Sequence, residues 1–317
     1  MTRVLALSGG IGGAKLALGL TRVLPPQDLA IVVNTGDDFT HLGLHISPDV
    51  DTALYTLAGI ANPELGWGRK DETWQFMRTL GELGGPAWFR LGDADLALHV
   101  TRTQALAAGQ PLSEVTADLA RRLGVAASVL PMSDDPVRTR VLTPQGELDF
   151  QRYFVALRCE PVVSALRYDG AAQARPAPGV LAALASPELE AVILCPSNPW
   201  LSMAPMLAIP ALREALAACA APVVAVSPLV GGQAVKGPTA KIMAELGLPV
   251  SADHVARYYG DLLDGFVLDV RDSGIEPRLG TASFVTDTLM RDLADRERLA
   301  RETLDFARRL KSQGAAS

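Results

Sequence analysis

The chain has 317 residues, with 29 Lys and Arg against 35 Asp and Glu, and its formal net charge is −6. Hydrophobic residues make up 49% of it and charged residues 20%, which is typical of a globular protein with a large core and excludes disordered or fibrous classes. The acidic balance argues against nucleic acid as a partner, because binding to nucleic acid depends on Lys and Arg contacts to phosphates.

The cysteine pattern and the hydropathy predict a cytoplasmic protein with no membrane partner. The three cysteines, Cys159, Cys195 and Cys219, lie far apart and form no CxxC pair. A sparse, odd count fits free thiols in a reducing compartment. No uncharged apolar run reaches the roughly 18 residues that would span a bilayer, and the N-terminal residues lack the pattern of a signal peptide.

The first forty residues predict one β-α-β unit. Val4–Leu7 is a short apolar run, and a glycine-rich turn over 8–13 follows it. Apolar residues with helical spacing over Lys15–Leu24 predict a helix that two prolines end. Leu29–Val33 is continuously apolar, as expected for a parallel strand that is buried on both faces.

Similar strand patterns recur in the second half of the chain, at Ala191–Leu194, Val223–Val226 and Phe266–Val270, and a helical pattern runs from about Asp287 to Leu310. Strands that alternate with helices predict an α/β fold with a Rossmann-like, doubly wound, mostly parallel sheet.

The middle of the chain differs in composition from the rest, and this difference predicts a second, smaller structural unit. It holds three of the four tryptophans, more charge and shorter apolar runs, and Thr143–Gly146 predicts the turn of a hairpin. We therefore expect residues 1–60 and 176–317 to form the Rossmann-like nucleotide- or phosphate-binding core. Residues 61–175 are expected to form a mostly helical insertion.

The glycine-rich turn predicts a phosphate site. Gly9, Gly10, Gly12 and Gly13 follow a strand and precede a helix. Glycines let the backbone approach a phosphate, and a helix N-terminus offers unpaired N–H groups. The spacing matches neither the dinucleotide fingerprint nor the Walker A loop. A tight turn without any ligand is the alternative.

Two acidic clusters lie close to this turn in the sequence, at Asn34–Asp38 and Ser47–Asp51. Ser47 and Pro48 predict the start of a helix that carries Asp49 and Asp51 in its first turn. Compensation of the helix dipole accounts for one acidic residue there. Two pairs of carboxylates beside a phosphate site favour Mg²⁺, which takes one or two carboxylates together with substrate oxygens.

Other loops carry candidate anion-binding groups. Ser197 and Asn198 lie between two prolines after an apolar strand, and they predict either phosphate or ribose binding or a turn that proline stiffens. Lys236 lies in a further loop and is suited to pair with an anion.

Arg90 stands beside Trp88 and Phe89, which favours stacking on a flat heterocycle, whereas two core aromatics are the plainer interpretation. His41 and His45 are four residues apart, but strand-like alternation around them argues against a helical zinc pair.

Several segments, in order along the chain, resemble the 2-phospho-L-lactate transferases of coenzyme F-420 biosynthesis. The likeness extends from residue 1 to about 270, and Gly66–Gly68 and Asp71–Trp74 are similar to bacterial members of that family. The segments that carry the likeness are Ser8–Lys15, Asn34–Asp38, Ser47–Thr56, Leu91–Asp93 and Pro196–Pro199.

The resemblance implies a reaction. The terminal hydroxyl of the deazaflavin Fo attacks the phosphorus that bears a three-carbon acid in a lactyl- or related acyl-diphosphoguanosine. GMP leaves, and coenzyme F-420-0 or a close variant remains. The acid is left open among 2-phospholactate, phosphoenolpyruvate-derived and 3-phosphoglycerate-derived units. A homodimer is also implied.

The resemblance also implies roles for individual residues. Residues that match Asp51 and Arg90 contact Fo in the family. An Asp aligns with Asp38, whereas members often have Glu at the position of Asp37, so Asp38 and Asp51 are expected to bind Mg²⁺ and to be catalytic. Asp51 is further expected to orient or deprotonate the Fo hydroxyl.

Two rival functions remain at this point. A related nucleotide-sugar-binding regulatory family shares the fold but lacks the pattern around Ser47–Asp51 and the aromatic insertion. A nicotinamide-dependent oxidoreductase should carry an acidic residue at the end of the second strand, where this chain has Asn34.

Overall fold

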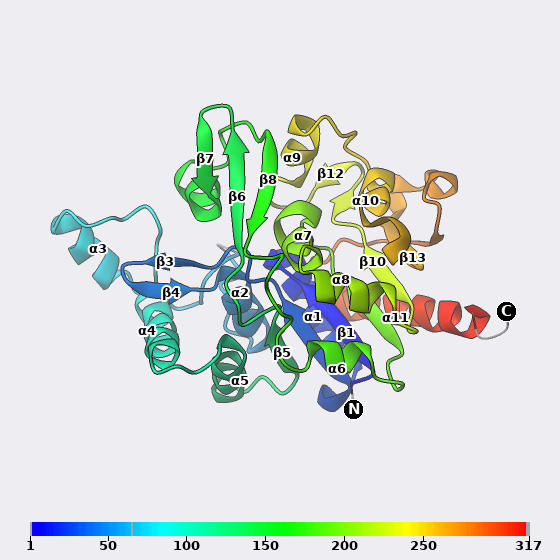
Figure 1. The fold of residues 1–317 in the computed structure, drawn as a ribbon, viewed down its shortest axis with the longest axis horizontal. Coiled ribbons are helices and arrows are strands. Elements are labelled where there is room, and N and C mark those ends of the chain that lie inside the picture. Colours follow the sequence, from blue (N-terminus) through cyan, green and yellow to red (C-terminus); the bar gives the residue numbers. More distant parts are fainter. Residues whose placement is uncertain (1, 65, 315–317) are drawn as a thin grey trace.

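A parallel sheet of seven strands forms the centre of the computed structural model, which describes residues 2–64 and 66–314 (Figure 1). Its strand order is β14-β13-β10-β9-β1-β2-β5, and every neighbouring pair runs parallel. The strands are β1 (Val4–Ser8), β2 (Leu29–Val33), β5 (Ser128–Pro131), β9 (Ala191–Leu194), β10 (Val223–Val226), β13 (Gly265–Asp269) and β14 (Ala282–Thr286).

The inner strands are buried on both faces, and this is why their sequences are continuously apolar. Leu5 pairs with Ala30 on one side of β1 and with Val192 on the other. The chain runs outward from β1 to β5, returns to β9 and then proceeds in the opposite direction. Open sheets of this kind bind ligands beyond the carboxyl ends of the strands where the order reverses, here between β1 and β9.

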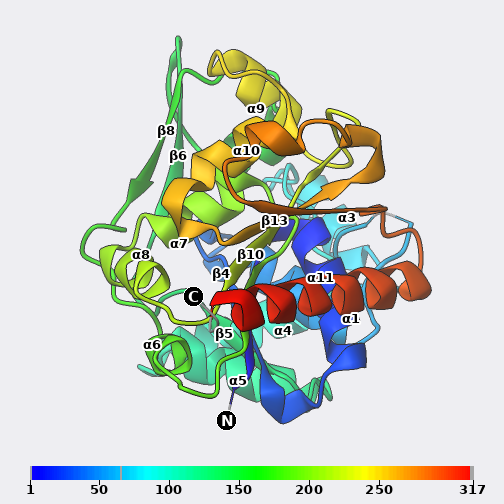
Figure 2. The same cartoon turned by 90° about the vertical axis from the view of Figure 1, so that its right-hand side faces the viewer.

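Helices cover both faces of the sheet. Val4 and Ala6 of β1 pack among residues of one helical layer, and Leu5 and Leu7 pack among residues of the other. Figure 2 shows α1 and α11 on the same side of the sheet. The first layer holds α1 (Gly10–Val23), α2 (Pro48–Leu57), α5 (Leu112–Arg122) and α11 (Leu293–Gly314), and the second holds α6 (Val180–Leu184), α7 (Ala204–Leu207), α8 (Pro210–Ala217) and α10 (Ala252–Tyr259).

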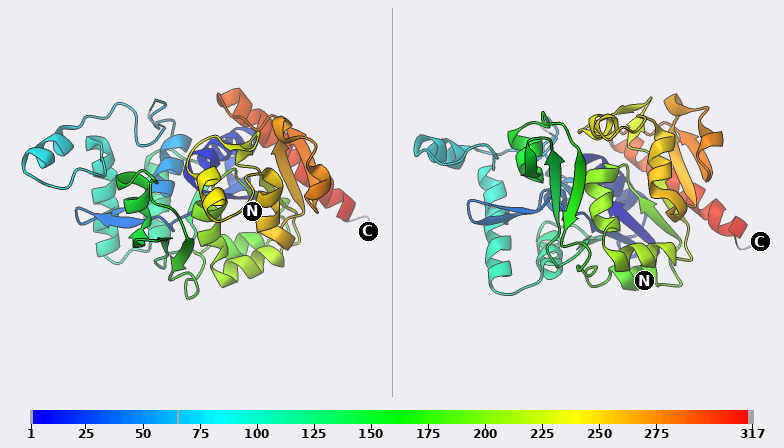
Figure 3. Two further views of the ribbon diagram at one scale, coloured as in Figure 1. Left: turned by 90° about the horizontal axis from the view of Figure 1, so that it is seen from above. Right: turned by 45° about the horizontal axis from the view of Figure 1, so that its top comes forward.

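The segment predicted as a mostly helical insertion, residues 61–175, is mixed in content. It contributes β5 to the edge of the central sheet, and it also forms a small antiparallel sheet in the order β7-β6-β8 (Figure 3). Thr143 pairs with Gly146, which confirms the predicted hairpin. The domain boundaries themselves stay a prediction. The other elements of the segment are α3 (Gln75–Glu82), α4 (Asp93–Ala107), β6 (Arg138–Thr143), β7 (Gly146–Asp149) and β8 (Ala165–Asp169).

Two short hairpins and one more helix complete the fold: β3 (Phe39–His41) with β4 (Leu44–Ile46), β11 (Leu229–Val230) with β12 (Gln233–Ala234), and α9 (Thr239–Glu245). The α/β, doubly wound prediction is confirmed. Within the described ranges, no helix combines the length and the apolarity needed to cross a membrane.

Candidate active site

A pocket of about 580 Å³ opens at the point where the strand order reverses. Its walls come from the loops that follow β1, β9 and β10, from the start of α2, and from residues 67–99 and 288–290. The residues that the sequence singled out and that line it are Gly9, Gly10, Gly12, Asp37, Asp49, Asp51, Trp88, Phe89, Arg90, Ser197, Asn198 and Lys236. Gly13 and Asp38 are not among its lining residues.

The glycine-rich segment is the first turn of a helix rather than a separate loop, because α1 already begins at Gly10. Gly10 has a φ of +62°, in the left-handed region that favours glycine. A Cβ at Gly12 would lie 2.3 Å from the carbonyl oxygen of Pro196. The glycines therefore let the start of α1 pack directly against the loop after β9, with the N–H groups of its first turn beside the pocket.

Ser197 and Asn198 hold the loop after β9 in place. Ser197 Oγ accepts a hydrogen bond from the N–H of Gly9 at 3.0 Å, which ties this loop to the glycine turn. Asn198 Oδ1 accepts from the N–H groups of Trp200 and Leu201 at 2.9 and 3.1 Å. The Asn198 side chain thereby caps a π-helical turn, Pro199–Met203, so its amide oxygen is engaged within the protein.

Two lysines face the pocket near the glycine turn. Lys15 Nζ donates to the carbonyl oxygen of Met290 at 3.1 Å. Burial and the nearby charges of Arg296 and Lys236 lower the pKa of Lys15. Lys236 is exposed and lines the same wall. These positive charges repel one another, and a bound anion would relieve that repulsion.

Two carboxylates lie on the other side of the glycine turn. Asn34 Nδ2 donates both to Asp37 Oδ1 at 3.0 Å and to Asp49 Oδ2 at 2.9 Å. Burial raises the pKa of Asp49 to about 6, although hydrogen bonds from Asn34 and Gly10 oppose the shift. Burial, with the charges of Asp49 and Asp38, raises the pKa of Asp37 well above its usual range. Burial and mutual repulsion therefore disfavour the charged forms of this pair, and a bound cation would stabilise them.

Asp51, in contrast, has a counter-ion. Both of its oxygens accept hydrogen bonds from the fully buried guanidinium of Arg102, one at 3.2 Å and one shorter. His99 joins the cluster, since its Nε2 lies 3.2 Å from Asp95 Oδ2 and its Nδ1 lies 3.7 Å from Asp51 Oδ2. Tyr55 donates its hydroxyl to Asp95. These buried polar contacts together fix the orientation of the Asp51 side chain.

Asp38 points away from the large pocket. Ser47 Oγ donates to Asp38 Oδ2 at 2.7 Å, and His45 Nε2 lies 3.1 Å from the same oxygen. Ser47 stands at the predicted start of α2, but its hydroxyl makes this bond instead of capping the helix. Asp38 lines a separate cavity of about 80 Å³, and its Oδ1 has no hydrogen-bond partner. Its predicted role as a magnesium ligand and catalytic residue stays a prediction.

Aromatic side chains line the end of the pocket that carries Arg90. The Arg90 guanidinium lies 4.2 Å from the ring centroid of Trp74, a cation–π geometry. Trp88 lines the pocket and packs edge-on against His41, with ring centroids 5.1 Å apart. Burial lowers the pKa of His41. The aromatics therefore both pack together and present a wall to the pocket.

Sequence reasoning left out the partners of Asp51, although one signal marks them. Asp95, His99 and Arg102 are spaced i, i+4 and i+7 along α4, so they share one face of that helix, and all three are buried. A stripe of three charged or polar residues at core spacing indicates a buried polar network rather than a solvated face. Tyr55, one turn after Asp51 on α2, carries no such signal.

Comparison with known proteins assigns the family. The family described as 2-phospho-L-lactate transferase CofD matches residues 4–302. A phosphoenolpyruvate transferase of Streptomyces griseus is 43% identical over 98% of this chain and 100% of its own length. A 2-phospho-L-lactate transferase of Methanopyrus kandleri is 41% identical over 97% of this chain and 98% of its own.

Among solved structures, a protein of the UPF0052 family from Bacillus halodurans has the same fold, with a TM-score of 0.63 at 13% identity over 96% of this chain and 99% of that one. This likeness concerns the fold alone. The sequence matches extend over nearly the whole chain and include every pocket segment described above. The chain therefore belongs to the 2-phospho-L-lactate transferase family and is a transferase of coenzyme F-420 biosynthesis.

Proposed function

We propose that the enzyme transfers a phosphorylated three-carbon acid from a guanosine-diphosphate-activated donor to the deazaflavin Fo and releases GMP. One observation carries this proposal: a single pocket presents a helix N-terminus with two lysines on one wall, and Asp51 and Arg90 on others. The first wall suits a diphosphate, and an aromatic wall with a guanidinium suits a flat ring system.

The residues of the pocket account for the steps of such a transfer. Asp51, held by Arg102, accepts the hydrogen bond and then the proton of the attacking Fo hydroxyl. The hydroxyl oxygen forms a bond to the phosphorus that bears the acid, and the bond from that phosphorus to the oxygen of GMP breaks. N–H groups at the start of α1, with Lys15 and Lys236, stabilise the negative charge on the departing GMP.

The carboxylates beside the glycine turn fit a magnesium ion. No group of three or more His, Cys, Asp and Glu side chains is arranged to hold a metal within the described part of the chain. Magnesium needs only one or two carboxylates when substrate oxygens and waters complete its shell. Asp37 and Asp49 meet that requirement and lack a cationic partner at close range, whereas Asp51 has Arg102. When bound, Mg²⁺ would neutralise charge on the diphosphate.

We therefore place Asp37 and Asp49 ahead of the sequence-based choice of Asp38 and Asp51 as magnesium ligands. Thermal unfolding with and without Mg²⁺ checks this order. Mg²⁺ should raise the Tm of the Asp38→Asn variant as it does that of the parent protein, and it should have little effect on Asp49→Asn. An unchanged Mg²⁺ response in Asp49→Asn would reverse the order.

Turnover of the Asp51→Asn variant tests the proposed role of that residue. This change keeps the shape of the side chain and removes the proton acceptor, so kcat should fall by about 100-fold or more at saturating Mg²⁺. Full turnover in this variant would rule out Asp51 as the base.

The relatives bear two names, so both phosphoenolpyruvate- and 2-phospholactate-derived donors belong in these assays. The homodimer and the cytoplasmic location stay predictions, and sedimentation of the purified protein checks the first of them.

A further inference from the structure

Asp269 is a buried carboxylate outside the pocket for which the reaction described above has no use. It is the last residue of β13 and is 0% exposed, at the same edge of the sheet as the pocket. Its Oδ1 accepts from the N–H and the Nη1 of Arg271, each at 2.9 Å. Its Oδ2 accepts from the N–H of Thr288 at 2.8 Å and from the Thr288 hydroxyl at 3.1 Å.

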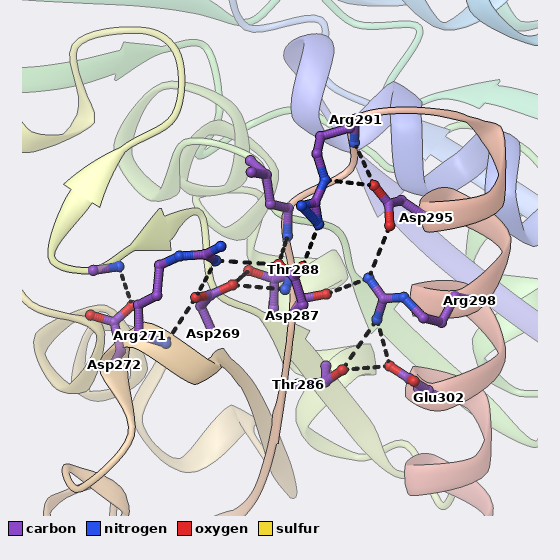
Figure 4. Close-up of polar contacts among 12 residues, drawn as sticks. Asp269, Arg271, Asp272, Thr286, Asp287, Thr288, Arg291, Asp295, Arg298 and Glu302 are labelled. Carbon is purple, nitrogen blue, oxygen red and sulfur yellow. Dashed lines mark hydrogen bonds and ion pairs between the residues drawn. The ribbon is translucent and has the colours of Figure 1, made fainter.

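Thr288, which Asp269 holds, is the first of three consecutive residues that line the pocket. Thr288, Leu289 and Met290 line the pocket, and the carbonyl oxygen of Met290 accepts the hydrogen bond from Lys15 Nζ. Asp269 therefore holds Thr288, which lies two residues before Met290, and the Met290 carbonyl orients the Lys15 ammonium. Figure 4 shows Asp269 and Thr288 pointing toward each other at the centre of this cluster.

Charged residues on the solvent side also bind this segment, at the residue just before Thr288. Arg271 Nη1 donates to Asp287 Oδ1 at 3.3 Å, and Arg298 Nη2 donates to the carbonyl oxygen of Asp287 at 2.6 Å (Figure 4). This anchoring explains why the predicted helix from Asp287 begins only at Leu293. Residues 287–292 form neither helix nor strand, and residues 288–290 among them line the pocket.

The loop that carries the second lysine, Lys236, is held by a neighbouring residue of the same cluster. Asp272 accepts hydrogen bonds from the N–H groups of Gly231 and Gly232, at 2.9 and 2.7 Å. These glycines form the turn between β11 and β12, and the loop that follows carries Lys236 into the pocket wall. Asp269 and Asp272 therefore hold, from one short segment, both the residues that orient Lys15 and the turn that precedes Lys236.

We propose that Asp269 is a positioning residue for the anionic donor: through Thr288 it fixes the Met290 carbonyl and thereby the Lys15 ammonium that faces the donor phosphates. This inference rests on the proposed function in taking the pocket's ligand to be a diphosphate. Asp269 itself touches no substrate. It acts through Lys15, and this makes its effect separable from a general loss of stability.

The Asp269→Asn variant should raise the KM for the guanylylated donor about tenfold, the size expected for one weakened charge-assisted hydrogen bond, with kcat changed less than about twofold. In a Lys15→Met background the same substitution should change the donor KM by less than about twofold, because the residue through which it acts is gone. A tenfold effect in both backgrounds, or in neither, would overturn the proposal.

A labelling measurement tests the position of Lys15 without any turnover. Acetic anhydride should acetylate Lys15 several-fold faster in Asp269→Asn than in the parent protein, by peptide mass spectrometry, with exposed Lys70 as the internal standard. Thr288→Val, which removes only the hydroxyl bond, should change the rate in the same direction by less. Asp305→Asn breaks an exposed pair with Arg308 on α11, away from this cluster, and should leave the rate unchanged.

The two readouts separate the two claims. If the parent protein binds no GDP and turns over no donor, the proposed function fails whatever Lys15 does. If GDP binds but Lys15 is acetylated equally in the parent protein and in both the Asp269 and Thr288 variants, the positioning role of Asp269 is wrong.

Discussion

At the scale of single residues, the site depends on buried charges whose partners differ. Asp51 is paired with Arg102, whereas Asp37 and Asp49 accept hydrogen bonds from neutral groups, the shared amide of Asn34 among them. Two acidic residues on the same helical turn, Asp49 and Asp51, therefore have different electrostatic environments. We attribute proton transfer to the paired carboxylate and cation binding to the unpaired ones.

Replacing Arg102 by methionine should destabilise the protein by about 3–5 kcal/mol, because Asp51 would remain buried without its counter-ion. Urea unfolding measures this loss. Arg121→Met, which breaks an exposed pair with Asp118 on α5, should cost less than about 1 kcal/mol. Equal losses in the two variants would mean that the buried Asp51–Arg102 pair contributes no more to stability than an exposed ion pair does.

Asp49 should make stability depend on pH. Its pKa is raised by burial to about 6 from an unfolded value near 3.8, so the folded state holds the proton to higher pH than the unfolded state. The free energy of unfolding should therefore fall as pH rises from about 4 to about 6, by about 2–3 kcal/mol from this group.

Asp49→Asn removes this titration. Its stability relative to the parent protein should rise between pH 4.5 and pH 7.5, as measured by urea unfolding in EDTA. Asp118 provides a control of opposite sign, because hydrogen bonds from Arg122 and Arg121 lower its pKa and its contribution is lost as pH falls. A pH-independent difference between Asp49→Asn and the parent would contradict the assignment.

At the scale of elements, the start of α1 determines the shape of the pocket. Gly10 has a left-handed φ, so Gly10→Ala should cost about 1 kcal/mol and should weaken GDP binding measured by calorimetry. Gly81 lies within helix α3 with open space around it, so Gly81→Ala should be neutral or stabilising by up to about 1 kcal/mol. A Gly10→Ala protein of unchanged stability and affinity would show that the turn tolerates a side chain.

Strands with continuous apolar sequence were predictable, and strands at the edges of the sheet were not. The inner strands β1, β2, β9, β10 and β13 carry the signal of burial on both faces. In β5 and β14 several residues are exposed or half-buried, so Ser128–Pro131 and Ala282–Thr286 lack a clear pattern. Tertiary contacts also override local preference after β14, where ion pairs hold residues 287–292 outside α11.

The same distinction applies to the site. Most of the residues selected from motifs line one pocket, because loops at the carboxyl ends of β1, β9 and β10 meet at one edge of the sheet. Arg102 and Asp269 were not selected, since their roles depend on contacts between segments 51 and 19 residues apart. Local spacing marks Arg102 as one of a buried polar stripe on α4, but it does not identify Asp51 as its partner.

At the scale of the whole molecule, an acidic protein is proposed to bind an anionic donor. The net charge of −6 is an average over the surface, whereas the glycine-turn side of the pocket presents Lys15 and Lys236 beside a helix N-terminus. Asp51 is paired with Arg102, whereas Asp37 and Asp49 form no ion pair within the described part of the chain and are suited to a divalent cation. Local arrangement therefore outweighs net charge for a small ligand.

We propose that this pocket joins Fo to the acid-bearing phosphate of a guanylylated donor. The most direct measurement mixes the purified protein with Mg²⁺, Fo and each candidate donor in turn, and it quantifies GMP and the phosphodiester by mass spectrometry. Both products should form in equal amounts with at least one donor, and neither should form when Fo is left out. Absence of GMP with every donor, or GMP released without Fo, would contradict this proposal.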